Sequence, residues 1–421
     1  MLNYSVAELR RIRLIILGVL SMVFASMCAQ TESWSLQRCL SLALDNSLYM
    51  RNGQIAVDKA KDLQGTTFDI EKTSISLSQD PTSGGSPDNG ITISQTFDFP
   101  TVYSARNKFL KAETAVAQSQ VAIVRNQLVR DVTSAYYSWL HSHGTLLVLQ
   151  KQDSVYQHFL QLASAKYKSG EANQLEQMNA QRLLNENRIS LQRAENDCKK
   201  YLLQLKQLIN TDADFTPQNE GLAKPYDTNL GEINFSDTPL GRNIQARLIS
   251  NERNVSLAKQ GYMPSFTLGF TTQAVIKGFN PYNIDRSRFS KGNFMGFEVG
   301  IGIPLFWKSN QSKVKAAKRD VELVQNERVL AEQQQKTLVR DAANEYMRAK
   351  QVLDYYEKQG NAEATLMAKL SQTNYENGEM GYVEYIQNQT SVLDVQLRYI
   401  DAVNDYNQAI ININYLNGNK Q

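Results

Sequence analysis

The sequence predicts a mostly α-helical chain that carries transmembrane β-strands and consists of two similar halves. Three observations lead to this fold class: a long internal repeat, long helical periodicities, and two pairs of segments in which apolar and polar residues alternate. The repeat is clearest at Leu128–Asp131, whose letters recur at Leu338–Asp341, and at Tyr167–Glu171, which aligns with Tyr375–Glu379. Continuing the alignment pairs three more identical residues, Tyr136 with Tyr346, Glu176 with Glu384 and Gln181 with Gln389. A repeat this long exceeds the roughly 20–50 residues of a solenoid unit and indicates a duplicated half.

The amino terminus predicts an export signal. A basic cluster ending at Arg13 precedes an apolar run from Leu14 to about Phe24 and then small residues, which is the layout of a secretory signal peptide. Residues 1–29 are therefore interpreted as a signal peptide that is cleaved near Ala29. The alternative is that Cys28 becomes a lipidated amino terminus, although the three residues before it match a lipidation motif poorly.

Composition and charge narrow the class of protein. The formal net charge of +3 over 421 residues gives no reason to expect nucleic acid as a partner. Beyond the amino terminus there is no run of about 18 apolar residues, so membrane-spanning helices are excluded. The two halves are placed at residues 30–225 and 226–421. Cys39 and Cys198 have no zinc or redox spacing and are interpreted either as two buried thiols or as a disulfide of an exported protein.

Helical periodicity predicts the helices of the first half. Short helices are expected at Ser35–Asn46 and from Gln54 to about Lys72, the second with Gly65 as a weak point. From about Tyr103 to Lys168 there is no proline, and apolar residues step by three or four positions. This long helix is followed by a return helix at about Asn173–Ile209.

One irregularity lies within the first long helix. His141–Gly144 is expected to mark a bend. Its two histidines are interpreted as solvated rather than as a metal site, because residues two positions apart do not share a helix face. In the second half, Asp237–Pro239 predicts a capped helix start. A long helix at about Gln311–Asn374 and a return helix at about Tyr382–Tyr415 then repeat the arrangement. A long helix with an antiparallel return forms a coiled-coil hairpin.

Two pairs of segments change from the helical period to strict alternation. In the first, within about residues 74–99, the apolar residues are Ile75, Leu77, Ile91, Ile93, Phe97 and Phe99. In the second, within about residues 264–303, they are Phe266, Leu268, Phe270, Met295, Phe297, Val299, Ile301 and Ile303. The segments approach the roughly 9–11 residues of a tilted transmembrane strand, and such alternation is typical of outer-membrane barrels. A soluble hairpin with one buried face would alternate in the same way, but two matched hairpins in an exported, duplicated chain favour the membrane.

Four strands per chain predict an oligomer. Open strand edges are not tolerated in lipid, and known barrels have about eight or more strands. Three copies of four strands would supply a 12-stranded β-barrel, and their four helical segments each would supply a 12-helix barrel continuous with it. The strand count therefore predicts a homotrimer. On the polar strand faces, Asp98 and Glu298 would line the lumen.

In this order of elements the sequence resembles the TolC-like family of bacterial outer-membrane efflux proteins, within it the type that serves cation and drug pumps. The resemblance rests on the repeated hairpin, long helix and return helix, on the Tyr-x-x-Gly-Glu motif at Tyr167–Glu171 and Tyr375–Glu379, and on Tyr262–Pro264 leading into a strand. It implies a homotrimeric channel in the lipid of the outer membrane that extends into the periplasm. It also implies two partners, a periplasmic adaptor protein and an inner-membrane transporter of the RND or similar type.

The resemblance further implies where the partners bind. The ends of the long helices would contact the adaptor, which makes docking candidates of Tyr167, Gly170, Glu171, Tyr375, Gly378 and Glu379. A glutamate just before a helix also complements its dipole, so Glu171 and Glu379 are equally well explained as helix caps. Family channels close at the periplasmic end, and the candidate gate residues there are Asp354, Glu376 and Glu384.

No catalytic pattern is present in the sequence. There is no nucleophile motif near the three histidines, no glycine-rich phosphate loop and no CxxC or HExxH, so neither an enzyme nor a cofactor is expected. The predicted function is a passive efflux conduit. The alternatives are an outer-membrane conduit for type I protein secretion and a periplasmic coiled-coil scaffold with soluble hairpins. A stand-alone porin would need more strands and has no use for long helices.

Overall fold

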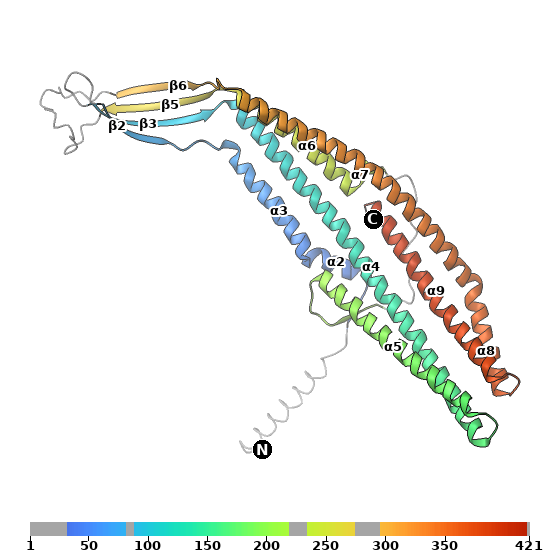
Figure 1. Cartoon of the computed structure of the whole chain (residues 1–421). Helices are drawn as coiled ribbons and strands as arrows, with labels where there is room; N and C mark the ends of the chain where they lie inside the picture. Colours follow the sequence, from blue (N-terminus) through green and yellow to red (C-terminus); the bar gives the residue numbers. More distant parts are fainter. Residues whose placement is uncertain (1–31, 81–87, 219–233, 274–294, 419–421) are drawn as a thin grey trace, which may run out of the picture. The chain divides into compact units, whose positions relative to one another are not determined.

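The computed structural model describes residues 32–80, 88–218, 234–273 and 295–418 (Figure 1). The predicted signal peptide, with Cys28, lies outside the described residues. The chain divides into two compact units, each of which takes segments from both halves of the sequence. Unit 1 comprises Met1–Ser47, Gln127–Leu230 and Asp341–Tyr415, and unit 2 comprises Leu48–Asn126, Gly231–Arg340 and Leu416–Gln421.

The chain is mostly helical, as predicted. The helices of unit 1 are α2 (Leu36–Asn46), α5 (Gln174–Ile209), α8 (Asn361–Glu376) and α9 (Tyr382–Leu416). The last residue of α9, Leu416, is assigned to unit 2. The helices of unit 2 are α3 (Leu48–Gln64) and α6 (Pro239–Lys259). Two long helices, α4 (Pro100–Ser169) and α7 (Lys308–Tyr355), supply residues to both units. Within the described residues, no helix has both the length and the hydropathy that crossing a membrane requires.

Unit 2 contains a four-stranded antiparallel sheet. Its strands are β2 (Ser74–Asp80), β3 (Asp88–Asp98), β5 (Ser265–Gln273) and β6 (Met295–Gly302). They lie where alternation predicted strands, and their order in the sheet is β2-β3-β5-β6. Ile93 lies opposite Phe270 and Phe97 opposite Phe266, so β3 and β5 join the two sequence-adjacent pairs into one sheet (Figure 1).

The register gives this sheet one apolar face and one small, polar face, because directly opposed residues share a face. The apolar face is made by Ile75, Leu77, Ile91, Ile93, Phe97, Phe266, Leu268, Phe270, Met295, Phe297, Val299 and Ile301, and it also includes Gln95 and Thr272. The other face is made by serine, threonine and glycine together with Asp98 and Glu298. On it, the hydroxyl oxygens of Thr92 and Thr271 lie 3.0 Å apart, and those of Thr96 and Thr267 lie 3.1 Å apart.

The helices of unit 2 begin and end at residues that satisfy free backbone groups. Thr238 caps α6, because its Oγ1 accepts the Gly241 N–H at 3.0 Å and Pro239 occupies the first turn, which confirms the predicted start. The prediction for α3 was wrong at both ends: the helix begins at Leu48 and ends at Gln64. A 3₁₀ turn, η1 (Gly65–Phe68), follows, in which the Thr66 and Thr67 hydroxyls donate to the last helical carbonyls at 2.7 and 2.6 Å.

In unit 1, α4 is continuous through His141–Gly144, where a bend was predicted. The histidines there make contacts, contrary to the solvated interpretation. His141 Nε2 lies 2.7 Å from Asp401 Oδ1 of α9, and the His143 ring stacks on Trp139 at 4.9 Å. Burial lowers the pKa of His143. The contacts with α9 and with the preceding turn keep this polar stretch helical.

An interruption that the sequence did not predict separates α7 from α8. It is a π-helical turn, η5 (Tyr356–Gly360). Gly360 is buried, and a Cβ atom built there would lie 2.9 Å from the Tyr356 ring. The widened turn therefore needs a residue without a side chain at its end.

Two short strands in unit 1 were also not predicted. β1 (Glu32–Trp34) pairs in parallel with β4 (Phe215–Pro217), and the rings of Trp34 and Phe215 stack at 3.9 Å. The region between the halves therefore contributes to the core of unit 1. Cys39 is buried, Cys198 is half-buried and both are free thiols. Burial raises the pKa of Cys39 to about 12 and that of Cys198 to about 11.

Candidate functional site

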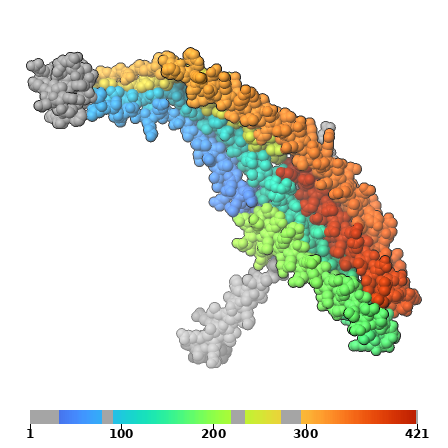
Figure 2. Space-filling model, in the orientation of Figure 1, coloured from blue at the N-terminus to red at the C-terminus, as the bar shows by residue number. Residues whose placement is uncertain are grey.

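The α4–α5 and α8–α9 connections lie side by side at one end of unit 1, as Figure 2 shows in green and red. Both have the backbone of a Schellman motif. At the end of α4, Gly170 N–H donates to Tyr167 O at 3.2 Å and Glu171 N–H to Lys166 O at 2.9 Å. At the end of α8, Gly378 N–H donates to Tyr375 O at 3.2 Å and Glu379 N–H to Asn374 O at 2.8 Å.

The two glycines make these connections possible. Gly170 has φ +81° and Gly378 has φ +77°, in the left-handed region that side chains disfavour. The Tyr-x-x-Gly-Glu motif is therefore the sequence of a helix end. Its glutamates precede the next helices, whose first turns instead contain Glu176 and Glu384. At α5 the cap is Asn173, whose Oδ1 accepts the Glu176 N–H at 3.0 Å, so the capping interpretation of Glu171 was wrong.

Tyr375 is the centre of the contact between the two connections. It is 2% exposed, and its hydroxyl donates to Glu176 Oε1 at 2.5 Å. Its ring stacks on Tyr385 at 4.5 Å and meets Phe159 edge-on at 5.5 Å, while Lys166 Nζ lies 4.2 Å from the ring centroid. Burial, and then the Glu176 carboxylate, raise the pKa of Tyr375 well above its ordinary range, so the hydroxyl stays a donor.

A compact core surrounds this contact. It consists of Tyr156, Phe159, Ala163, Ala180, Leu183, Leu184, Tyr375 and Tyr385, from α4, α5, α8 and α9. Burial raises the pKa of Tyr385 to about 12. Glu176 is a buried carboxylate in this core, and the tyrosine hydroxyl supplies the hydrogen bond that a buried charge requires.

The remaining docking candidates are exposed. Tyr167 is 42% exposed, in contrast to Tyr375, and Glu171 and Glu379 are also exposed. Among the described residues, neither the Tyr167 hydroxyl nor the Glu384 carboxylate has a hydrogen-bond or ion-pair partner. The two connections therefore have the same backbone but different surroundings.

The three gate candidates do not form one group. Glu384 lies in the first turn of α9 and Glu376 in the last turn of α8. Glu376 accepts hydrogen bonds from Gln372 at 2.9 Å and from His158 at 3.2 Å. Both lower the pKa of Glu376, and the bond from Gln372 has the larger effect. Asp354 belongs to α7, before η5, and lies 3.4 Å from Lys358 Nζ. The helical rise separates Asp354 from Glu376 by ~30 Å.

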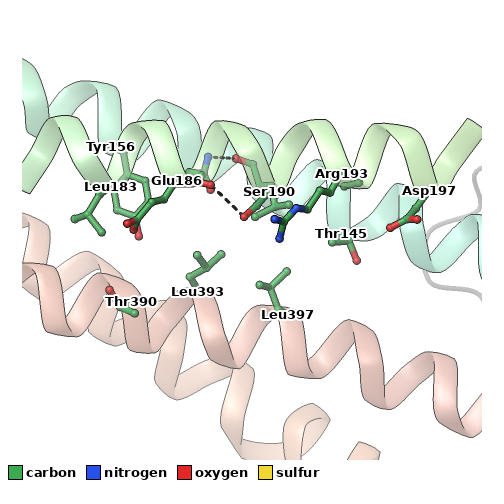
Figure 3. Close-up of a pocket in the computed structure, with 13 residues that line it drawn as sticks. Thr145, Tyr156, Leu183, Glu186, Ser190, Arg193, Asp197, Thr390, Leu393 and Leu397 are labelled. Atoms are coloured by element: carbon green, nitrogen blue, oxygen red, sulfur yellow. Dashed lines mark hydrogen bonds between the residues drawn. The ribbon is translucent and has the colours of Figure 1, made fainter.

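A groove that the sequence did not predict runs between α4, α5 and α9 in unit 1 (Figure 3). Leu393 and Leu397 of α9 point into it from one side, and Glu186, Arg193 and Asp197 of α5 lie on the other. Its lining has the mixed character of a surface between packed helices. In the described part of the chain, no three His, Cys, Asp or Glu side chains are grouped as metal ligands.

The two lumen candidates lie on the polar face of the sheet in unit 2. Asp98 is paired, with Oδ2 3.3 Å from Arg106 Nη2, and its N–H donates to the Tyr103 hydroxyl at 2.9 Å. Glu298 lies opposite Gly269, and a Cβ atom built on that glycine would lie 3.1 Å from the Glu298 Cβ. Glycine at 269 therefore gives the Glu298 side chain room to lie on the sheet.

Comparison with known proteins agrees with this architecture. No curated protein sequence matches the chain. Among solved structures, the fold is similar to that of a membrane protein from Pseudomonas aeruginosa, with a TM-score of 0.77 and 16% identity over 92% of this chain and 91% of that one. It is also similar to the outer membrane protein VceC from Vibrio cholerae, with a TM-score of 0.73 and 13% identity over 91% and 96% of the two chains.

A third similar structure is the open state of the MtrE outer membrane channel from Neisseria gonorrhoeae, with a TM-score of 0.73 and 15% identity over 91% of this chain and 88% of that one. At these identities the likeness shows the fold. The family is shown by a sequence model, that of the outer membrane efflux protein, which matches residues 65–211 and 242–419. The match spans the sheet, both long helices and both connections, and the chain therefore belongs to the outer membrane efflux protein family.

Proposed function

We propose that the protein is the outer-membrane channel of a tripartite efflux system. It would act as a passive conduit across the outer membrane and periplasm for substrates that an inner-membrane transporter of the RND or similar type delivers through a periplasmic adaptor. Membership of the outer membrane efflux protein family supports the efflux role. The observation that carries the proposal is the two-faced sheet of unit 2.

Many large side chains on the apolar face of the sheet are exposed, which is unfavourable in water. Phe297 is 86% exposed, and Ile75, Leu268, Val299 and Ile301 are also exposed. Phe306 and Trp307, which follow β6, are exposed as well. A contiguous apolar face with aromatic residues at its end is typical of a barrel surface that contacts lipid.

The sheet cannot serve as a barrel alone. The outer strands β2 and β6 each pair on one side only within the described residues. Each unpaired N–H or C=O group in lipid costs on the order of several kcal/mol. We therefore propose a homotrimer in which three four-stranded sheets form a 12-stranded β-barrel, with the polar face, including Glu298, toward the lumen. The helices of the three chains would continue it as a helical barrel, built from two repeats per chain at residues 30–225 and 226–421.

The connections of unit 1 are the proposed docking site for the adaptor. Tyr167, Glu171 and Glu379 offer exposed side chains there, while Gly170 and Gly378 set the backbone and Tyr375 holds the two connections together. Glu384 and Glu376 lie beside this site and stay candidates for the gate. A conduit for type I protein secretion would use the same architecture with a different transporter, and it is the second candidate.

The experiment that tests the proposal is the native mass of the protein extracted in mild detergent from purified outer membranes. A trimer that dissociates on heating is expected. A monomer in the soluble periplasmic fraction would instead favour the scaffold alternative and would overturn the barrel.

Labelling tests the two faces of the sheet. The Val299→Cys variant is expected to react with a membrane-confined thiol reagent. The Glu298→Cys variant is not, because Glu298, which directly precedes Val299 in the chain, lies on the opposite face. Equal reaction at both positions would contradict the proposed orientation.

A further inference from the structure

We infer that the Tyr167 hydroxyl of one chain donates a hydrogen bond to the Glu384 carboxylate of a neighbouring chain. It would be the counterpart, between two chains, of the hydrogen bond that Tyr375 donates to Glu176 within one chain. The inference rests on the proposed homotrimer and names two residues that would join its chains.

The contact within the chain is the template. Tyr375 comes from the end of the helix before a connection, and Glu176 comes from the first turn of the helix after the other connection. Their hydrogen bond of 2.5 Å is formed inside the core that α4, α5, α8 and α9 share. A donor from the second half of the chain thus meets an acceptor from the first half.

The chain carries the same pair a second time, with the halves exchanged. In the repeat alignment Tyr375 corresponds to Tyr167 and Glu176 corresponds to Glu384. The backbone around each tyrosine is the same, because both helix ends have the same Schellman hydrogen bonds. The second pair is not joined within the chain: both residues are exposed, and among the described residues neither side chain has a polar partner.

Apolar residues around the second pair are also exposed, whereas the corresponding residues around the first pair are packed. Met178 corresponds to Ile386, which packs against the core, yet Met178 is 59% exposed. Leu370 corresponds to Leu162, which also packs against the core, yet Leu370 is 52% exposed. Met367 is exposed in the position where Phe159 is buried. A face of the first half and a face of the second half therefore lack the neighbour that their counterparts have.

A second copy of the chain supplies the missing neighbours. Its first half would contact the second half of the next copy, and because the two contacting faces differ, the contact is heterologous. A heterologous contact closes into a ring when the rotation between copies is suitable, as in a trimer. Three contacts within chains and three between chains would then alternate around the ring.

Cross-linking tests the contact directly. Cysteines at Tyr167 and Glu384 are introduced together in a variant whose Cys39 and Cys198 are alanine, and a short bismaleimide is added to the protein in outer membranes. Covalent dimers and trimers are expected on denaturing gels. The matched control has cysteines at Glu176 and Tyr375, and it is expected to stay monomeric because its cross-link lies within one chain. Single-cysteine variants report any contribution from another thiol.

The heat stability of the trimer tests the hydrogen bond. Tyr167→Phe removes the donor and Glu384→Leu removes the acceptor, and each is expected to lower the temperature at which the trimer dissociates. The double variant is expected to lower it little further, because both changes remove the same bond. Asp212→Leu, which changes an exposed carboxylate of unit 1 outside the two connections, is expected to leave it unchanged. A native trimer without interchain cross-links, or fully additive losses, would overturn this inference and leave the channel proposal standing. A monomeric native mass would overturn both.

Discussion

The α4–α5 and α8–α9 connections of unit 1 have the same five-residue motif and the same backbone hydrogen bonds, but their tyrosines occupy different environments. Tyr375 is enclosed by Phe159, Tyr385 and Glu176, whereas Tyr167 is exposed. Two copies of one local sequence therefore fold alike and pack differently. The difference arises because, in the described part of unit 1, the Glu176 side of the first half faces the Tyr375 side of the second half, which leaves Tyr167 and Glu384 without that neighbour.

The largest expected difference between the connections comes from removing each tyrosine. Tyr375→Ala deletes a buried ring and is expected to cost about 3–5 kcal/mol of the free energy of local opening. Tyr167→Ala is expected to cost less. In the repeat alignment Phe159 corresponds to Met367 and Tyr385 corresponds to Gln177, so no aromatic ring is present at the two positions that would contact Tyr167. Hydrogen exchange of the amides in α5 and α9 measures both values. Equal losses would contradict the difference in packing.

Removing only the hydroxyl is expected to have a smaller effect. Tyr375→Phe keeps the ring contacts but leaves the Glu176 carboxylate buried without its donor, at a cost of about 1.5–3 kcal/mol. The same exchange measurement reports this loss. Adding Glu176→Gln should restore part of the stability, because a neutral side chain is less costly to bury. A double variant with the sum of the two single losses would show that the groups act independently.

The glycines test the similarity of the two connections. Gly170→Ala and Gly378→Ala each place a side chain at positive φ, where about 1–2 kcal/mol is lost, and the two losses are expected to be equal. Gly381→Ala is the matched control, since a Cβ atom there meets nothing within 4 Å and its φ is not positive. Thermal denaturation of the three variants measures the effect. A loss at one connection only would show that the backbones are not equivalent.

The smallest expected effect is a pH dependence confined to the α8–α9 connection. Hydrogen bonds from Gln372 and His158 lower the pKa of Glu376 from its ordinary 4.5, so the folded state favours the carboxylate. The resulting stabilisation is present above the ordinary pKa and is lost as the pH falls through the lowered one. The corresponding residue of the α4–α5 connection is Lys168, so that position carries no carboxylate. Stability of the wild type and of Glu376→Gln, compared from neutral to acidic pH, should converge at acidic pH, and a constant difference would contradict the prediction.

Predictions from the sequence were accurate where a local pattern was sufficient. Alternation located β2, β3, β5 and β6, periodicity located the long helices, and Thr238 with Pro239 located the start of α6. The pairing of β1 with β4 was missed because it joins three-residue segments near the two ends of the first repeat, with no alternation to detect. The π-helical turn η5 was missed because nothing in the order of apolar residues marks it.

The long helices, the four strands of the sheet and the two helix ends could be predicted from the sequence, because helical periodicity, alternation and a glycine at positive φ act over a few neighbouring residues. The sequence also indicated the candidate residues at each connection. The burial of Tyr375 against Glu176, and the exposure of Tyr167 and Glu384, could be found only from the packing of the helices. The physical reason is that burial depends on which helices lie opposite a side chain, and identical motifs in one chain meet different neighbours.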